Sequence, residues 1–190
     1  MRIAIDADQV LFDFLSTWHT FAENTLKREL VERNQSYHLI ARYGLSMAEF
    51  VRCCTMFDLR DAWKDCPVIP EALEAVQAWL EADHEVFVIS AVSVKARKSR
   101  QKVLDKLGLR QVRLIGAGFG GSKFDPLRIL KPEIFADDLW AHCREAVDAG
   151  VPRVARIRGN HDGGGGPVPG VPVLENIGEL VIEQQNDHIG

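Results

Sequence analysis

The chain has 190 residues, 46% of them hydrophobic and 26% charged, and its formal net charge is -4. A chain of this length can bury one substantial core, and the weak acidic charge argues against a nucleic-acid polymer as its partner. No apolar run is long enough to span a bilayer, and the sequence enters a strand pattern at once, without a signal-peptide pattern. We therefore expect a cytoplasmic protein that does not bind membranes.

The first predicted strand ends at a pair of carboxylates. Residues 2–5 form a mainly apolar run, Asp6 and Asp8 follow it, and residues 10–12 are apolar again. These flanks place both aspartates at the edge of a core, where their charges repel each other unless a cation or a shared proton compensates. Mg²⁺ is a natural compensator because it prefers carboxylate oxygens and water. An aspartate in such a position can also act as a covalent nucleophile.

Helical patterns follow the two aspartates. Apolar side chains recur every three or four residues over residues 15–31 and predict an amphipathic helix. Two further helices are predicted over residues 36–44 and 46–57, and Ser46 and Glu49 have the spacing of a capping box at the start of the second. This part of the chain is therefore expected to be all-helical.

This arrangement predicts two domains. Residues 15–66 form a small helical cap, and residues 1–14 together with residues 67–190 form the core. Pro67 and Pro70 mark the return to the core, because each proline disfavours helix at the residue before it. Most aromatic side chains of the cap are expected to pack inside it, and a few could overhang the two aspartates and select the substrate.

The core shows alternating strand and helix patterns. Short apolar runs predict strands, and segments of about ten residues with helical spacing separate them. This alternation predicts an α/β fold in which a Rossmann-like parallel sheet is covered by helices on both faces. The further predicted strands are residues 86–89, 112–115, 134–136 and 154–157, and the predicted helices are residues 71–82, 95–108, 124–130, 140–149 and 175–184.

Two polar segments of the chain carry further expectations. The helix over residues 95–108 is basic, and its Lys95 and Arg97 could reach a phosphate, although a solvated helix face is the simpler interpretation. The loop over residues 158–172 contains four consecutive glycines, so we expect it to be mobile. We expect no metal site at His161 within this loop.

Polar side chains stand at the carboxyl ends of three further strands. Ser90 follows the second predicted strand, Lys123 follows the glycine-rich loop after the third, and Asp137 and Asp138 close the fourth. Ligands of parallel α/β folds bind beyond the carboxyl ends of the strands. These side chains are therefore predicted to surround one site together with the first pair of aspartates.

The stretch Asp6-Ala7-Asp8-Gln9-Val10-Leu11 resembles the first motif of the haloacid dehalogenase-like superfamily, and the polar residues at the other three strand ends resemble its remaining motifs in the same order. The resemblance implies a Mg²⁺-dependent phosphatase that acts on a small phosphomonoester. Dehalogenase members of the superfamily lack the second acid of the first motif. Its presence here therefore favours a phosphatase over a dehalogenase.

The resemblance also implies a role for each candidate residue. Asp6 would attack phosphorus and form an aspartyl-phosphate, and Asp8 would protonate the leaving oxygen and later activate water. Ser90 and Lys123 would bind the phosphate; Lys131 is a rival for the second role because it lies closer in sequence to the second acidic pair. The implied metal ligands are Asp6, Asp8 through its backbone carbonyl, and either or both of Asp137 and Asp138.

A helical insertion after the first motif resembles the 5'(3')-deoxyribonucleotidase-like branch of the superfamily, and Asp13-Phe14 fits that branch as well. This implies a nucleoside monophosphate as one candidate substrate. The protein is expected to be a monomer or a homodimer, and the sequence does not distinguish the two. Two residues depart from the branch. Gln9 stands where many relatives carry glycine, and Ala91 lacks a hydroxyl that the branch often supplies.

Two other functions remain open. Residues 116–121 match the pattern GxGxxG after a strand, with Asp137 roughly twenty residues later, as in dinucleotide-binding oxidoreductases. Pro126 follows too soon for a long helix that would cradle a pyrophosphate. The third possibility is a binding or regulatory module that keeps the fold and Mg²⁺ without turnover.

Overall fold

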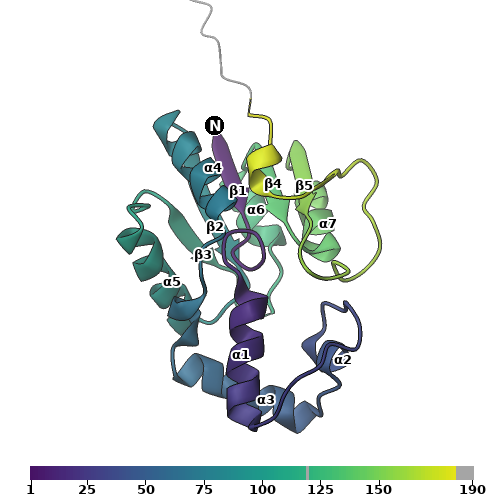
Figure 1. Ribbon diagram of the computed structural model, residues 1–190. Helices are drawn as coiled ribbons and strands as arrows, with labels where there is room; N and C mark the ends of the chain where they lie inside the picture. Colours follow the sequence, from purple (N-terminus) through teal and green to yellow (C-terminus); the bar gives the residue numbers. More distant parts are fainter. Residues whose placement is uncertain (119, 183–190) are drawn as a thin grey trace, which may run out of the picture.

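A six-stranded sheet lies at the centre of the computed structural model, which describes residues 1–118 and 120–182 (Figure 1). All neighbouring strands pair in parallel, in the order β3-β2-β1-β4-β5-β6, so β1 lies inside the sheet. The predicted α/β fold class is confirmed. The strands are β1 (Arg2–Ile5), β2 (Glu85–Ser90), β3 (Arg113–Gly116), β4 (Ile134–Asp137), β5 (Arg153–Ile157) and β6 (Val173–Leu174).

Helices cover both faces of the sheet because successive strand side chains point to opposite faces. The covering helices are α4 (Pro70–Glu81), α5 (Val94–Lys106), α6 (Phe124–Leu130) and α7 (Trp140–Asp148). Ile5 of β1 shares a buried cluster with Val76 of α4 and Leu104 of α5, whereas Ala4 shares another with Leu127 of α6. The inner strands are therefore apolar on both faces, which explains their continuous apolar sequence.

A helical segment lies beyond the carboxyl ends of the strands (Figure 1). It contains α1 (Phe14–Leu26), α2 (Leu39–Tyr43), α3 (Met47–Leu59) and the 3₁₀ turn η1 (Ala62–Asp65), and no strand occurs between residues 15 and 66, all of which the structure describes. The predicted capping box at the start of α3 is present, with Ser46 and Glu49 bonded to each other's backbone N–H groups. The predicted helix over residues 15–31 is too long, because the left-handed backbone of Lys27 (φ 56°) ends α1.

The two chain connections to the helical segment lie side by side. Asp13 donates its backbone N–H to the carbonyl of Pro67, and Ile69 donates to the carbonyl of Leu11, both at 2.9 Å. Lys95 of α5 contacts the C-terminal end of α3, because its Nζ lies 2.6 Å from a backbone carbonyl in the last turn of that helix. One buried cluster joins the segment to the sheet. The division into a cap domain and a core domain stays a prediction.

The predicted helix over residues 175–184 is wrong for the part that the structure describes, and residues 183 and 184 lie outside it. Residues 173–174 form β6 on the edge of the sheet, where Arg158 donates its backbone N–H to the carbonyl of Leu174 at 2.7 Å. Only the short turn η2 (Ile177–Glu179) follows, started by the side chain of Asn176. Residues 175–182 therefore contain one short 3₁₀ turn in place of the expected continuous helix. Within the described residues, no helix has the length and apolar character needed to cross a membrane.

Candidate active site

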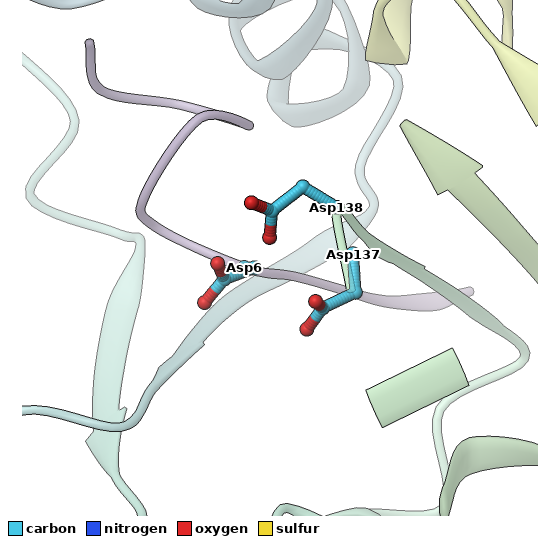
Figure 2. A group of neighbouring side chains, drawn as sticks. All are labelled: Asp6, Asp137 and Asp138. Atoms are coloured by element: carbon cyan, nitrogen blue, oxygen red, sulfur yellow. The ribbon is translucent and has the colours of Figure 1, made fainter. Parts of the chain in front are cut away.

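Three carboxylates gather where β1 and β4 end side by side. Asp6 directly follows β1, and its backbone N–H extends the pairing of the two strands by donating to the carbonyl of Ala136 at 2.9 Å. Asp137 is the last residue of β4, and Asp138 follows it. Figure 2 shows the three side chains, and one carboxylate oxygen of each lies within 4.8 Å of those of the others. We call Asp6, Asp137 and Asp138 the acid cluster.

Lys123 lies within the acid cluster. Its Nζ is 2.5 Å from Oδ1 of Asp6 and 2.7 Å from Oδ2 of Asp137, and its side chain is fully buried. Its backbone N–H donates to Oε2 of Glu145 at 2.7 Å, which fixes Lys123 at the start of α6. Lys131 instead ends α6 in a left-handed conformation (φ 50°) and is exposed. Of the two candidate lysines, the structure brings Lys123 to the acids.

Asp137 is surrounded by donors. Its Oδ1 accepts from the backbone N–H of Leu139 at 2.9 Å and lies 3.2 Å from Nδ1 of His142, while its Oδ2 contacts Lys123. Burial opposes ionisation of this carboxyl, but the charges of Lys123 and His142 hold its pKa well below the ordinary value. Asp137 is therefore an ionised carboxylate whose oxygens are already engaged.

Ionisation is disfavoured at Asp6 and Asp138, the other two members of the acid cluster. Burial raises the pKa of Asp6 to about 6 against the opposing effect of Lys123, and the charges of Asp137 and Asp8 add to the increase. Burial, together with the charges of Asp137 and Asp6, raises the pKa of Asp138 well above its ordinary value. A cation placed between the two carboxyls would stabilise their ionised forms.

The side chain of Asp8 pairs with Arg100 of α5. Nη2 of Arg100 donates to Oδ1 of Asp8, and the guanidinium is fully buried between the rings of Phe12 and Trp63, with their centroids 5.1 and 4.8 Å from Cζ. The side chain of Asp8 is 26% exposed, which leaves it accessible at the margin of the site. The sequence analysis considered only Lys95 and Arg97 of this basic helix, so it missed Arg100 as a site residue.

Ser90 is the last residue of β2. The pairing of Ile5 with Val88 in the register of β1 and β2 places Ser90 at the same edge of the sheet as Asp6. Ser90 is fully buried, and its hydroxyl has no hydrogen-bond partner among the described residues. A buried hydroxyl left unpaired costs about 1–3 kcal/mol. A ligand oxygen at the strand ends would remove this cost.

His161 enters the site from the loop between β5 and β6. Its Nε2 lies 2.6 Å from Oδ2 of Asp138, and its side chain is only 2% exposed. Its Nδ1 accepts from the backbone N–H of Gly163 at 3.0 Å, so Nε2 carries the proton and donates to Asp138. Burial and the charge of Arg156 lower the pKa of His161 to about 4, in keeping with a neutral ring. The expectation of a mobile loop without site residues gave no indication of this contact.

The charge balance of the site fits a divalent cation. The acid cluster and Asp8 supply four carboxylates, whereas Lys123 and Arg100 supply two positive charges, which leaves two negative charges when every carboxyl is ionised. Carboxylate and carbonyl oxygens are the ligands that Mg²⁺ prefers. The donor set and the unpaired hydroxyl at the neighbouring strand end therefore suit a magnesium ion and a bound oxyanion.

No protein-family model matches the sequence, and no curated protein sequence matches it. Solved structures do match over nearly the whole chain. CbbY from Rhodobacter sphaeroides, determined in complex with phosphate, is 16% identical, with a TM-score of 0.61 and coverage of 94% of this chain and 95% of that one.

Two further similar structures carry the names of hydrolases. A predicted phosphoglycolate phosphatase from Haemophilus somnus is 13% identical, with a TM-score of 0.63 and coverage of 93% and 94% of the two chains. A HAD family hydrolase from Deinococcus radiodurans with bound phosphate and sodium is 14% identical, with a TM-score of 0.57 and coverage of 91% and 90%. The chain has the fold of these hydrolases; identities this low establish the fold alone.

Proposed function

We propose that this protein is a Mg²⁺-dependent hydrolase of small phosphomonoesters that acts through an aspartyl-phosphate on Asp6. The observation that carries the proposal is the acid cluster, in which one buried lysine bridges Asp6 and Asp137 while burial and the neighbouring carboxylates oppose ionisation of Asp6 and Asp138. The fold shared with CbbY, determined in complex with phosphate, and with a HAD family hydrolase, determined with bound phosphate and sodium, supports this assignment. The motifs at the other strand ends support it as well.

The geometry favours Asp6 and Asp138 as the side chains that would hold Mg²⁺, together with the backbone carbonyl of Asp8. Asp137 is less suited, because Leu139, His142 and Lys123 already occupy its oxygens, and we assign it the task of holding Lys123 in place. The ion would supply positive charge that screens the nucleophile from the phosphate and polarises a phosphoryl oxygen.

The protein's own residues would carry the reaction in two displacements. A carboxylate oxygen of Asp6 forms a bond to phosphorus while the ester P–O bond breaks, and Asp8 gives its proton to the leaving oxygen. Asp8 then takes a proton from the attacking water, whose oxygen displaces Asp6 and releases inorganic phosphate. Lys123 balances charge beside the nucleophile, and the Ser90 hydroxyl donates to a phosphoryl oxygen.

The substrate is a small molecule, and nucleoside monophosphates are one candidate class suggested by the helical segment after the first motif. The Asp6 side chain is only 8% exposed and Lys123 is fully buried. Entry of a phosphate therefore requires the residues around Asp6 and Lys123 to move. A surface depression of about 430 Å³ lined by α1 and η1 contains none of the predicted site residues, and we assign it no role in catalysis.

The geometry does not favour the dinucleotide-binding alternative. The helix after the GxGxxG loop has only seven residues, and the side chain of Glu145 accepts the backbone N–H of Lys123 at its start. A negatively charged pyrophosphate would have to displace that carboxylate. Residue 119 of the glycine pattern lies outside the described residues.

Hydrolysis of p-nitrophenyl phosphate and of a panel of nucleotide, sugar and amino-acid phosphates, with Mg²⁺ and with EDTA, tests the proposal. We expect Mg²⁺-dependent release of phosphate and a loss of at least roughly 10³-fold in the Asp6→Asn and Asp8→Asn variants. A fluoroberyllate adduct should form on the wild type and on Asp8→Asn, but not on Asp6→Asn.

Other outcomes would identify the alternatives. A wild type that binds Mg²⁺ but hydrolyses no ester of the panel and forms no adduct would be a binding module. Quenching of protein fluorescence by NAD(P)H, without phosphatase activity, would indicate the oxidoreductase. Full activity in Asp6→Asn would refute the covalent mechanism.

A further inference from the structure

The loop between β5 and β6 contacts the acid cluster and the helical segment at the same time. Inside the site, His161 is bonded to Asp138 through Nε2 and is held by the backbone of Gly163 through Nδ1. Arg156 of β5 ties the two ends of this contact together, because Nε donates to the carbonyl of Asp138 and Nη2 to the carbonyl of His161. The imidazole of His161 is therefore held in one position, with its Nε2–H group directed at Asp138.

The same contact determines which oxygen of Asp138 remains available. His161 engages Oδ2, and no hydrogen bond to Oδ1 is present among the described residues. A donor on one carboxylate oxygen restricts rotation of the side chain and directs the other oxygen toward a ligand, and such outer contacts of metal ligands strongly affect metal affinity. The immediate neighbour, Asp137, has no equivalent freedom because both its oxygens are engaged.

The helical segment holds the loop from outside. Asp162 donates its backbone N–H to the carbonyl of Gln35 at 2.8 Å, and its Oδ1 accepts the backbone N–H of Tyr37 at 3.0 Å. Arg42 of α2 donates to the carbonyl of Asn160 at 2.6 Å. A glycine-rich loop has little conformational preference of its own, so these contacts supply much of its order.

We propose that His161 is a positioning residue for Asp138, and that the contacts of its loop with residues 35–42 link metal affinity to the position of the helical segment. The inference rests on the proposed function, in which Asp138 is a Mg²⁺ ligand. Linkage is reciprocal: a segment docked on the loop strengthens metal binding, and bound metal strengthens docking.

Calorimetric titration of the EDTA-treated protein with Mg²⁺ measures the effect without reliance on turnover. His161→Asn and His161→Gln form a matched pair: the Asn amide reaches only the position of Nδ1, whereas the Gln amide reaches that of Nε2 and can donate to Asp138. We expect the Asn variant to bind Mg²⁺ about 10- to 100-fold more weakly than the wild type. The Gln variant should stay close to the wild type. His161→Phe, which keeps a planar ring without a donor, should behave like the Asn variant and serves if that variant is poorly folded.

His84→Phe is the control for loss of a histidine, because His84 precedes β2 at the opposite end of the sheet from the acid cluster. It should bind Mg²⁺ like the wild type. The link to the helical segment is tested by Asp162→Ala, for which we expect weaker Mg²⁺ binding than in the wild type. In the His161→Phe background the same change should have no further effect.

The outcomes separate this inference from the proposed function. Equal Mg²⁺ affinity in wild type, Asn and Phe variants, with phosphatase activity present, would overturn the role of His161 and leave the phosphatase intact. Equal losses in the Gln and Asn variants would show that the loop packing matters, not the donor, and would also overturn it. An additive effect of Asp162→Ala in the Phe background would overturn the link to the segment. Absence of Mg²⁺ binding in the wild type would refute the proposed function itself.

Discussion

Asp137 and Asp138 are adjacent in the sequence, and their surroundings are opposite. Asp137 accepts hydrogen bonds from the backbone and contacts Lys123 and His142, so its pKa lies well below the ordinary value. Asp138 has one neutral partner, His161, and its pKa lies well above the ordinary value because of burial and neighbouring carboxylates. The difference supports our proposal that Asp137 holds Lys123 in place and that Asp138 is a ligand of the metal ion.

Replacement of Asp137 should give the largest change in stability. In Asp137→Asn the buried Lys123 keeps Asp6 as its only charged partner. Removing one member of a buried ion pair typically costs 3–5 kcal/mol, and because Asp6 remains we expect a loss of about 3 kcal/mol in the free energy of unfolding. Urea denaturation of the metal-free protein measures it. Unchanged stability would mean that the ion pair to Lys123 does not support the fold.

Asp6, the third carboxylate of the acid cluster, should make stability depend on pH. Its folded pKa of about 6 exceeds its ordinary value of 3.8, so the folded state binds more protons between these values, and stability falls as pH rises through this window. We expect the metal-free wild type to lose up to about 1.4 kcal/mol per pH unit relative to Asp6→Asn. Saturating Mg²⁺ should abolish the decline, because bound metal keeps the carboxylate ionised. Thermal or urea denaturation from pH 4 to 7 tests the slope, and an opposite slope would contradict it.

Replacement of Asp138 should change stability in the opposite direction from replacement of Asp137. Asp138→Asn removes a buried carboxyl whose ionisation is opposed by burial and by the charges of Asp137 and Asp6, while its amide oxygen can still accept from His161. We expect the Tm of the metal-free variant to rise by roughly 2–4 °C. Added Mg²⁺ should raise it further by much less than in the wild type, because ligand stabilisation requires binding. Destabilisation by both Asn variants would remove the distinction between the two aspartates.

Sequence patterns predicted where the charged residues of the acid cluster lie, but not the contacts that distinguish Asp137 from Asp138. Asp6, Lys123 and the two adjacent aspartates follow predicted strands, and parallel strands bring their carboxyl ends to one edge, so local patterns were enough to place them. Which aspartate has free oxygens was not predictable, because Leu139 and His142 reach Asp137 only through the backbone path after β4.

Arg100 and His161 were missed for different reasons. Arg100 had a signal: Ala96 and Leu104, four residues before and after it, are apolar and buried, so the spacing places Arg100 on the inner face of its helix. The basic composition of the helix concealed this periodicity. His161 had no local signal, because its burial depends on contacts between a glycine-rich loop and residues 35–42, more than a hundred positions earlier. Sequence patterns of short range cannot report such contacts.

Replacement of Gln9 should give the smallest change in stability. Gln9 lies next to the loop that carries His161, the partner of Asp138. Gln9 lies almost buried in the loop after β1 and has a left-handed backbone (φ 59°). It packs close to Gly159, two residues before His161, because a Cβ added at Gly159 would lie 3.4 Å from the Cβ of Gln9. Gln9→Gly relieves the left-handed strain of about 1–2 kcal/mol, and the added freedom of glycine in the unfolded chain offsets about 0.5–1 kcal/mol. We expect a net gain of about 0.5 kcal/mol.

Lys27→Gly is the matched control for Gln9→Gly, because Lys27 has the same backbone conformation (φ 56°) at the end of α1, away from the acid cluster. Urea denaturation should show a similar gain for both variants if backbone strain alone matters at Gln9. If Gln9 also supports the loop that carries His161, the Gln9→Gly gain will be smaller than that of Lys27→Gly, and Mg²⁺ affinity will fall only in Gln9→Gly. A larger gain at Gln9 than at Lys27, with unchanged metal affinity, would show that this side chain gives no support to the Asp138 side of the site.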